Sequence, residues 1–132
     1  MLLDTGPMVA LLTEKDSPSY ETFELIFETF LGNLITTLPS ITEAVHLVGN
    51  WHFKSLILGW IEDKSILVLS LGESDLSRLS TLMEKYRDTP MDFADASLVV
   101  AAEVLKAKQI FTSDTDFSVY RINGSDRFEI VP

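Results

Sequence analysis

The sequence predicts an α/β protein with a parallel sheet and helices on both of its faces. Short apolar, β-prone segments alternate with segments of helical spacing along the whole chain. Gly and Pro are sparse and fall singly between these segments, as is typical of one compact domain. The length of 132 residues also fits one domain, which we assign to residues 1–132.

The chain opens with a strand and two helices. We predict a strand at Met1–Asp4, which Thr5-Gly6-Pro7 ends. Because Thr can cap a helix and Pro is tolerated in a first turn, a helix should follow as far as Leu12. Ser17-Pro18-Ser19 then starts a second helix, whose apolar residues recur at helical spacing: Phe23, Ile26, Phe27, Phe30 and Leu31.

The middle of the chain continues the alternation. A β-prone run at Leu34–Leu38 ends at Pro39, and helices are predicted from about Ser40 to Asn50 and from about His52 to Glu62. Ile66–Leu69 is a continuous apolar run, which is typical of a strand covered on both faces. We expect the large aromatic residues of this region to lie in the core, namely Trp51, Phe53 and Trp60.

The last third contains two helices and two strands. The helix before Pro90 is amphipathic and is marked by Leu76, Leu79, Met83 and Tyr86. Asp92–Lys106 is apolar around most of its circumference, which predicts a buried, central helix. Gln109–Thr112 and Phe128–Val131 read as strands, with a turn or short helix around Asp114–Val119 between them.

Composition excludes several classes of protein. Twenty Asp and Glu against ten Lys and Arg give a net charge of −10, which argues against a protein that coats DNA. The lack of Cys excludes a disulfide scaffold, a Cys-ligated zinc site and a thiol nucleophile. Leu98–Ala102 is too short to span a membrane, and Met1-Leu2-Leu3-Asp4 lacks the basic segment of a signal peptide. We therefore expect a cytoplasmic protein with no membrane association.

Acidic residues are predicted to share one edge of the sheet. Asp4 ends the first strand, Asp114 follows a later strand with Asp116 two residues on, and Glu43 follows the second strand. The carboxyl ends of parallel strands lie together, and sites form there. Asp95 lies in the first turn of the buried helix, on its apolar side, so it should point toward the core.

Carboxylates placed in this way favour a metal ion. They repel one another, and burial adds to the cost of their charge. A hard divalent cation relieves both effects, and oxygen ligands suit Mg²⁺ or Mn²⁺. Such ions support phosphoryl chemistry, so the pattern points to a site that acts on phosphates.

Each acid also has a structural interpretation. Asp4 can act as a turn former, and Ser40-x-x-Glu43 matches an N-terminal capping box. Helix capping, or a favourable interaction with a helix dipole, would account for the remaining acids: Asp92, Asp95, Asp114 and Asp116. The functional interpretation rests on their joint placement at one edge.

Four segments resemble the PIN domain family, and most closely the VapC-type toxin ribonucleases. They are, in order, Leu3-Asp4-Thr5-Gly6, Ile41-Thr42-Glu43-Ala44-Val45, Met91-Asp92-Phe93-Ala94-Asp95-Ala96 and Phe111-Thr112-Ser113-Asp114-Thr115-Asp116-Phe117. Order, spacing and length fit from residue 1 to the end. The resemblance implies a Rossmann-like α/β/α sandwich with a mostly parallel sheet of about four or five strands.

The resemblance also implies a Mg²⁺- or Mn²⁺-dependent endoribonuclease, in which a metal-activated water attacks phosphorus in line. Carried over to this chain, the catalytic acids would be Asp4, Glu43, Asp95 and Asp114. The metal ligands would be Asp4, Asp95, Asp114 and Asp116, with Thr5, Asp92 and Thr112 in secondary or orienting roles. The implied partners are an RNA substrate, an antitoxin protein and a second copy in a homodimer.

Other functions fit part of the pattern. The net charge is unusual for an RNA-binding protein and the basic residues form no run, so a PIN-like binding or assembly module with little nuclease activity is the second hypothesis. Asp4-Thr5-Gly6 also occurs in aspartic proteases, but these are all-β proteins and helices dominate here. A receiver domain would need a central phospho-acceptor Asp and a late Lys after a strand, and the sequence shows neither. His46 and His52 are expected to be non-catalytic residues at or near the surface.

Overall fold

Five parallel strands form the central sheet of the protein, whose computed structural model describes all residues from 1 to 132. The sheet order is β3-β2-β1-β4-β7, and every neighbouring pair is parallel. From β1 the sheet therefore grows one way through β2 and β3 and the other way through β4 and β7, as in Rossmann-type folds. The strands are β1 (Leu2–Leu3), β2 (Leu34–Thr37), β3 (Ile66–Leu69), β4 (Gln109–Phe111) and β7 (Glu129–Val131).

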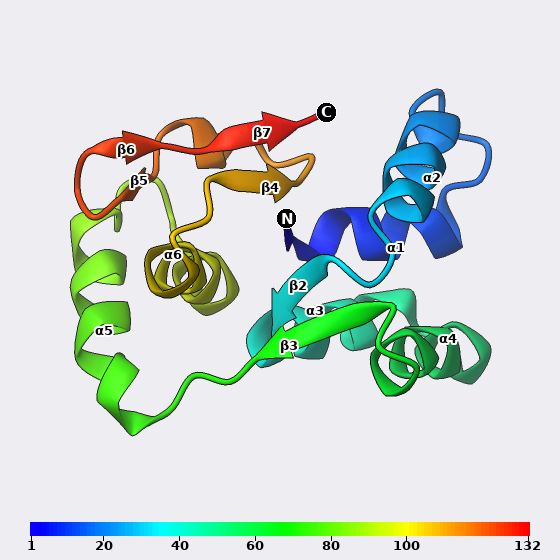
Figure 1. Cartoon of the computed structure of the whole chain (residues 1–132), viewed down its shortest axis with the longest axis horizontal. Helices are drawn as coiled ribbons and strands as arrows, with labels where there is room; N and C mark the ends of the chain where they lie inside the picture. The colour runs from blue at the N-terminus through cyan, green and yellow to red at the C-terminus, as the bar shows by residue number, and fades with distance from the viewer.

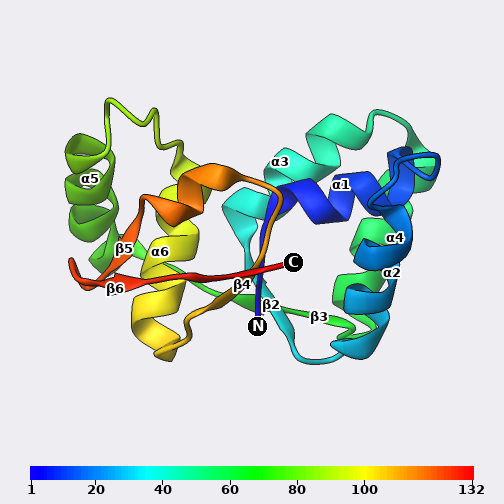
Figure 2. The same ribbon diagram turned by 90° about the horizontal axis from the view of Figure 1, so that it is seen from above.

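Six α-helices flank this sheet, which confirms the predicted α/β architecture. The helices α1, α2 and α4 lie on one side of the sheet and α5 and α6 on the other, with α3 at the carboxyl edge of the strands (Figures 1 and 2). Their bounds are α1 (Thr5–Thr13), α2 (Tyr20–Thr29), α3 (Leu38–Val48), α4 (Trp51–Glu62), α5 (Leu76–Lys85) and α6 (Phe93–Leu105). None of the helices has the length and hydropathy needed to cross a membrane.

The sheet separates two hydrophobic cores. Because side chains alternate along a strand, Leu2 belongs to the core on the side of α5 and α6, whereas Leu3 belongs to the core under α1 to α4. Ile110 and Phe111 of β4 divide in the same way. Helix α6 buries every residue from Ala94 to Ala102, so the predicted buried helix is confirmed.

Two predictions about the edges of the fold are wrong. Strand β3 is the outermost strand and Leu67 is 38% exposed, so this apolar run is not covered on both faces. Trp51 begins α4 and is 72% exposed, although its aromatic character suggested a core position. In both cases the apolar side chains are present but the fold places no further element over them.

Two helix starts also differ from the predictions. Asp4, not Thr5, is the N-cap of α1. Helix α3 begins at Leu38 with Thr37 as its N-cap, two residues earlier than predicted. The capping box proposed for Ser40 and Glu43 is therefore absent, and Glu43 lies in the second turn of α3.

A small antiparallel hairpin of β5 (Arg121–Ile122) and β6 (Asp126–Arg127) was not predicted. Two short 3-10 helices, η1 (Glu73–Asp75) and η2 (Thr115–Ser118), precede α5 and β5 respectively. The strands of the hairpin have two residues each, which is too short for an alternating pattern to show in the sequence.

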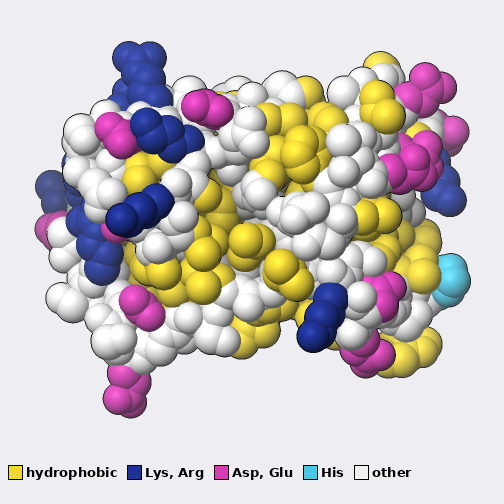
Figure 3. Space-filling model, viewed as in Figure 1, with side chains coloured by type: hydrophobic (Ala, Val, Ile, Leu, Met, Phe, Trp, Pro, Cys, Tyr) yellow, Lys and Arg dark blue, Asp and Glu magenta, His cyan; other side chains and the backbone are white.

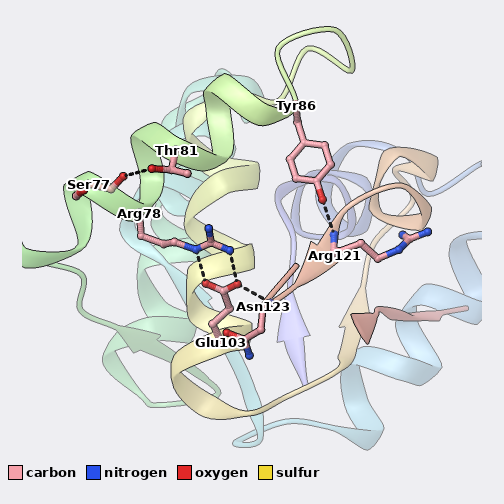
Figure 4. Close-up of polar contacts among 7 residues, drawn as sticks. All are labelled: Ser77, Arg78, Thr81, Tyr86, Glu103, Arg121 and Asn123. Carbon is pink, nitrogen blue, oxygen red and sulfur yellow. Dashed lines mark hydrogen bonds and ion pairs between the residues drawn. The ribbon is translucent and has the colours of Figure 1, made fainter. Parts of the chain in front are cut away.

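The hairpin is tied to α5 and α6 by polar contacts (Figure 4). Arg78 of α5 donates two hydrogen bonds to the carboxylate of Glu103 on α6, at 2.9 and 2.8 Å. Glu103 Oε2 also accepts the Asn123 N–H at 2.7 Å, and the Tyr86 hydroxyl accepts the Arg121 N–H at 3.0 Å. These contacts hold the segment between η2 and β6 against both helices.

Candidate active site

Five acids line one cleft of about 230 Å³ at the carboxyl edge of the sheet. Four of them are the predicted catalytic residues Asp4, Glu43, Asp95 and Asp114, and the fifth is Asp92. The starts of α1, α3 and α6 and the segment after β4 meet at this edge (Figure 2). The cleft lies where the strand order reverses between β1 and β4, which is where ligands bind in open α/β sheets.

Asp4 is a buried carboxylate with two hydrogen-bond donors. It is 6% exposed, its Oδ1 accepts the Thr5 N–H at 2.8 Å, and its Oδ2 accepts the Thr112 hydroxyl at 2.6 Å. Burial, with smaller effects from the charges of Asp114 and Glu43, raises the pKa of Asp4 to about 6 against the opposing effect of these two donors. Asp4 therefore gains strongly from any cation placed beside it.

Thr112 connects two of the acids. Its hydroxyl donates to Asp4 Oδ2 and accepts the Asp114 N–H at 2.9 Å. Asp114 in turn accepts the Asp116 N–H at 2.8 Å and is the N-cap of η2, so the prediction that it caps a short helix is correct. Asp114 also lines the cleft. Asp116 does not line the cleft and lies behind Asp114 in η2.

Thr5 orients Glu43 across the cleft. The Thr5 hydroxyl lies 3.0 Å from Glu43 Oε2 and 3.2 Å from the Ser40 carbonyl oxygen, and it can donate to either. Thr5 is buried and Glu43 is half-buried, and both line the cleft, so the contact fixes one oxygen of Glu43 at its wall.

Asp92 and Asp95 hold one another at the start of α6. Asp92 Oδ1 accepts the Asp95 N–H at 2.7 Å, and Asp95 Oδ2 accepts the Asp92 N–H at 3.2 Å, which is a capping box. Asp95 is 8% exposed, as its apolar side predicted. Burial and the charge of Asp92, with smaller effects from Asp4 and Asp114, raise the pKa of Asp95 to about 7.

Several residues at the site were not predicted from the sequence. Tyr120 is fully buried behind Asp95, and its hydroxyl donates to Asp95 Oδ2 at 3.3 Å. Gly6 and Ser113 line the cleft, and a Cβ on Gly6 would lie 2.8 Å from Ser113 Oγ. A side chain at position 6 would therefore displace the Ser113 hydroxyl within the cleft. Leu47 of α3 completes the lining.

The donor set of the cleft fits a hard divalent cation. All of its charged side chains are carboxylates, and none of them takes part in an ion pair of the protein. The carboxylates are spread around the cleft, and no three of them are close enough together to form a ready-made ligand group. The fit rests on the oxygen atoms and their uncompensated charge and not on a preassembled geometry.

Basic residues gather at one end of the molecule although they form no run in the sequence. Seven of the ten lie between residues 78 and 127, and Figure 3 shows most of the Lys and Arg on its face at the end that carries α5 and the hairpin. They are Arg78, Lys85, Arg87, Lys106, Lys108, Arg121 and Arg127. The net charge of −10 therefore does not describe every part of the surface.

Comparisons with known proteins identify the family. A solved structure with a similar fold is that of VapC20 from Mycobacterium tuberculosis, described as a Sarcin-Ricin loop cleaving toxin. The likeness has a TM-score of 0.79 at 13% identity and covers 89% of this chain and 92% of that chain. A search of curated proteins found no match. The PIN domain profile matches residues 1–123, and the chain belongs to the PIN domain family.

Proposed function

We propose that the protein is an endoribonuclease that hydrolyses RNA phosphodiester bonds at the acidic cleft with Mg²⁺ or Mn²⁺. The observation that carries this proposal is the pair of buried carboxylates, Asp4 and Asp95, which share the cleft with three further acids and have no cationic partner. PIN domains are typically metal-dependent nucleases, and the similar VapC20 structure is described as that of a Sarcin-Ricin loop cleaving toxin.

The cleft residues divide into ligands and orienting groups. Asp4, Asp95 and Asp114 would hold the metal, with Asp116 behind Asp114 as a further ligand candidate. A bound Mg²⁺ or Mn²⁺ supplies an activated water and neutralises charge on the phosphate. Glu43 would accept a proton from the attacking water with its free oxygen, since Thr5 holds the other.

Three further residues keep the acids in place. Thr112 orients Asp4 and the backbone of Asp114 through one hydroxyl. Asp92 fixes the first turn of α6 and with it the side chain of Asp95. No residue of the chain needs to act as a nucleophile, because water attacks phosphorus and the ribose oxygen leaves.

A protein partner is part of the proposal. We infer that the chain is the toxin of a toxin–antitoxin pair and that it forms a homodimer. Exposed apolar side chains on α2, α3 and α4 support this inference, because they leave an interaction surface uncovered. The most exposed are Trp51 at 72%, Leu25 at 65% and Leu38 at 59%.

A binding or assembly module without nuclease activity is the second candidate. The observation that favours it is the net charge of −10, because RNA backbone contacts usually come from Lys and Arg. The two candidates differ in whether the acids of the cleft are needed for turnover.

Cleavage of a mixed pool of structured RNA separates them. The purified protein would be incubated with Mg²⁺, with Mn²⁺ or with EDTA, beside Asp4→Asn and Asp95→Asn. Asp88→Asn serves as a matched control, because Asp88 is an exposed acid outside the cleft. We expect metal-dependent cutting that both cleft variants lose and the control keeps. Cutting that persists in EDTA or in both cleft variants would overturn the proposal.

A further inference from the structure

A second cavity, of about 600 Å³, adjoins the acidic cleft between α3 and the start of α6. It shares Glu43 and Asp92 with the cleft, so the two form one continuous depression. Its volume is in the range of pockets that hold small molecules. Any chain whose phosphate lies at the acids therefore has its neighbouring group within reach of this cavity.

Phe93 gives this cavity an aromatic wall. It is the first residue of α6 and is 46% exposed, although its helix is otherwise the most buried in the protein. Leu38, which is 59% exposed, and Pro39 add further apolar surface at the start of α3. An exposed ring at the N-terminal end of a buried helix is costly to solvate and adds little to the core. Its placement suits a ligand with a flat face.

The other wall of the cavity is polar. Thr42 and His46 of α3 line it beside the two shared carboxylates. Glu43 Oε2 already accepts the Thr5 hydroxyl and Asp92 Oδ1 accepts the Asp95 N–H, which leaves one acceptor oxygen on each carboxylate. The wall therefore offers hydrogen-bond acceptors and negative charge to whatever packs on Phe93.

We propose that this cavity binds a nucleobase of single-stranded RNA next to the scissile phosphate, stacked on Phe93 with an exocyclic amino group toward Asp92. The proposal rests on the proposed nuclease function and adds a base-binding subsite to it. Proteins bind unpaired bases by stacking them on aromatic side chains and reading their edges by hydrogen bonds. A carboxylate oxygen accepts hydrogen bonds from exocyclic amino groups, which adenine, cytosine and guanine carry and uracil lacks.

The pocket can be tested with RNA oligomers of identical length. Oligo(C) and oligo(U) are matched probes, because cytosine and uracil differ at the exocyclic group. Affinity would be measured by fluorescence anisotropy with the Asp4→Asn variant in Mg²⁺, and KM and kcat with the catalytically intact protein. We expect oligo(C) to bind about tenfold more tightly than oligo(U).

Variants of Phe93 test the stacking. Phe93→Leu should raise Kd and KM for oligo(C) about tenfold with little change in kcat, and Phe93→Tyr should restore both. Val104→Ala is the matched control, because Val104 lies on the same helix and is 56% exposed but does not line this cavity, and it should leave both unchanged. Sedimentation of the same variants would report whether the cavity is instead covered by a second copy.

The outcomes separate this inference from the nuclease proposal. Equal binding of the two oligomers, an unchanged Kd in Phe93→Leu, or a shift from dimer to monomer in that variant would overturn the base pocket. Binding that depends on Phe93 while the intact protein cleaves nothing would support the pocket and contradict the nuclease.

Discussion

The Thr112 hydroxyl donates to Asp4 Oδ2 at 2.6 Å and links two residues 108 positions apart in the sequence. The contact joins the ends of β1 and β4, which are neighbours in the sheet where the strand order reverses. Because the same hydroxyl accepts the Asp114 N–H, it holds two acids of the cleft with one group. The Rossmann-type strand order thus places this Thr where it can organise the site.

Thr112→Val should impair the cleft without unfolding the protein. Removal of the hydroxyl takes away a donor that opposes the raised pKa of Asp4, so that pKa should rise further. We expect the pH at which activity reaches half of its maximum to rise, and activity at pH 7 to fall about tenfold. Thr112→Ser keeps the hydroxyl and should behave like the parent protein. An unchanged pH–rate curve in Thr112→Val would contradict the role of Thr112.

The pH dependence of stability should report the burial of Asp4. The pKa of Asp4 is about 6 in the folded protein, against the usual 3.8 expected in the unfolded chain, so between these pH values Asp4 holds a proton only in the folded protein. The contribution of this proton to the free energy of unfolding is therefore fully present below about pH 4 and is lost as the pH rises through 6. Relative to Asp4→Asn, the free energy of unfolding of the metal-free parent should fall by up to about 3 kcal/mol over this range. Urea titrations of both proteins in EDTA would measure it, and a constant difference would contradict the burial.

Metal binding should reverse that loss. At pH 7.5, Mn²⁺ should raise the Tm of the parent protein and leave Asp4→Asn nearly unchanged, because the ion binds only the folded cleft. The rise should be smaller at pH 5.5, where protons compete for Asp4 and Asp95. Equal shifts in the parent and the variant would place the ion elsewhere.

Tyr120→Phe should weaken metal binding at the cleft. The change removes the hydroxyl that donates to Asp95 Oδ2 and keeps the buried ring. We expect several-fold weaker Mn²⁺ binding with little loss of stability. Tyr86→Phe is the matched control, since its hydroxyl accepts from Arg121 and does not touch an acid of the cleft. Calorimetric titration of the two variants would compare them, and equal affinities would remove Tyr120 from the site.

Gly6→Ala should narrow the entrance between α1 and the segment after β4. The new Cβ would lie 2.8 Å from Ser113 Oγ, so the Ser113 side chain must move within the cleft. Activity should fall several-fold, and the double variant Gly6→Ala with Ser113→Ala should recover most of it. Steady-state cleavage rates of Gly6→Ala, Ser113→Ala and the double variant would measure this coupling, and additive losses of activity would contradict it.

Sequence patterns predicted the sheet and its helices because buried apolar residues recur at spacings typical of strands and helices. The alternation of apolar runs with helical spacing located α1 to α6 and the strands of the parallel sheet. Parallel topology then placed Asp4, Glu43 and Asp114 at one edge. The sequence did not show that β3 is an edge strand, because an apolar run looks the same whether one face or both are covered.

Long-range contacts were the part that the sequence could not supply. Tyr120 reaches Asp95 across 25 positions, and no local pattern marks a tyrosine whose hydroxyl points at an acid. The sequence indicated that Asp92 could cap the helix, because an N-cap is a local feature, but it did not indicate the reciprocal capping box with Asp95. The hairpin of β5 and β6 was missed since each of its strands has two residues.

Crystals grown with Mn²⁺ would test the central claim most directly, through anomalous diffraction at the manganese edge. The account predicts an anomalous peak in the cleft within coordination distance of Asp4, with Asp95 or Asp114 as a second ligand, and no such peak for Asp4→Asn. A fully loaded crystal with manganese only at other sites, or a cleft peak that persists in the variant, would contradict the account.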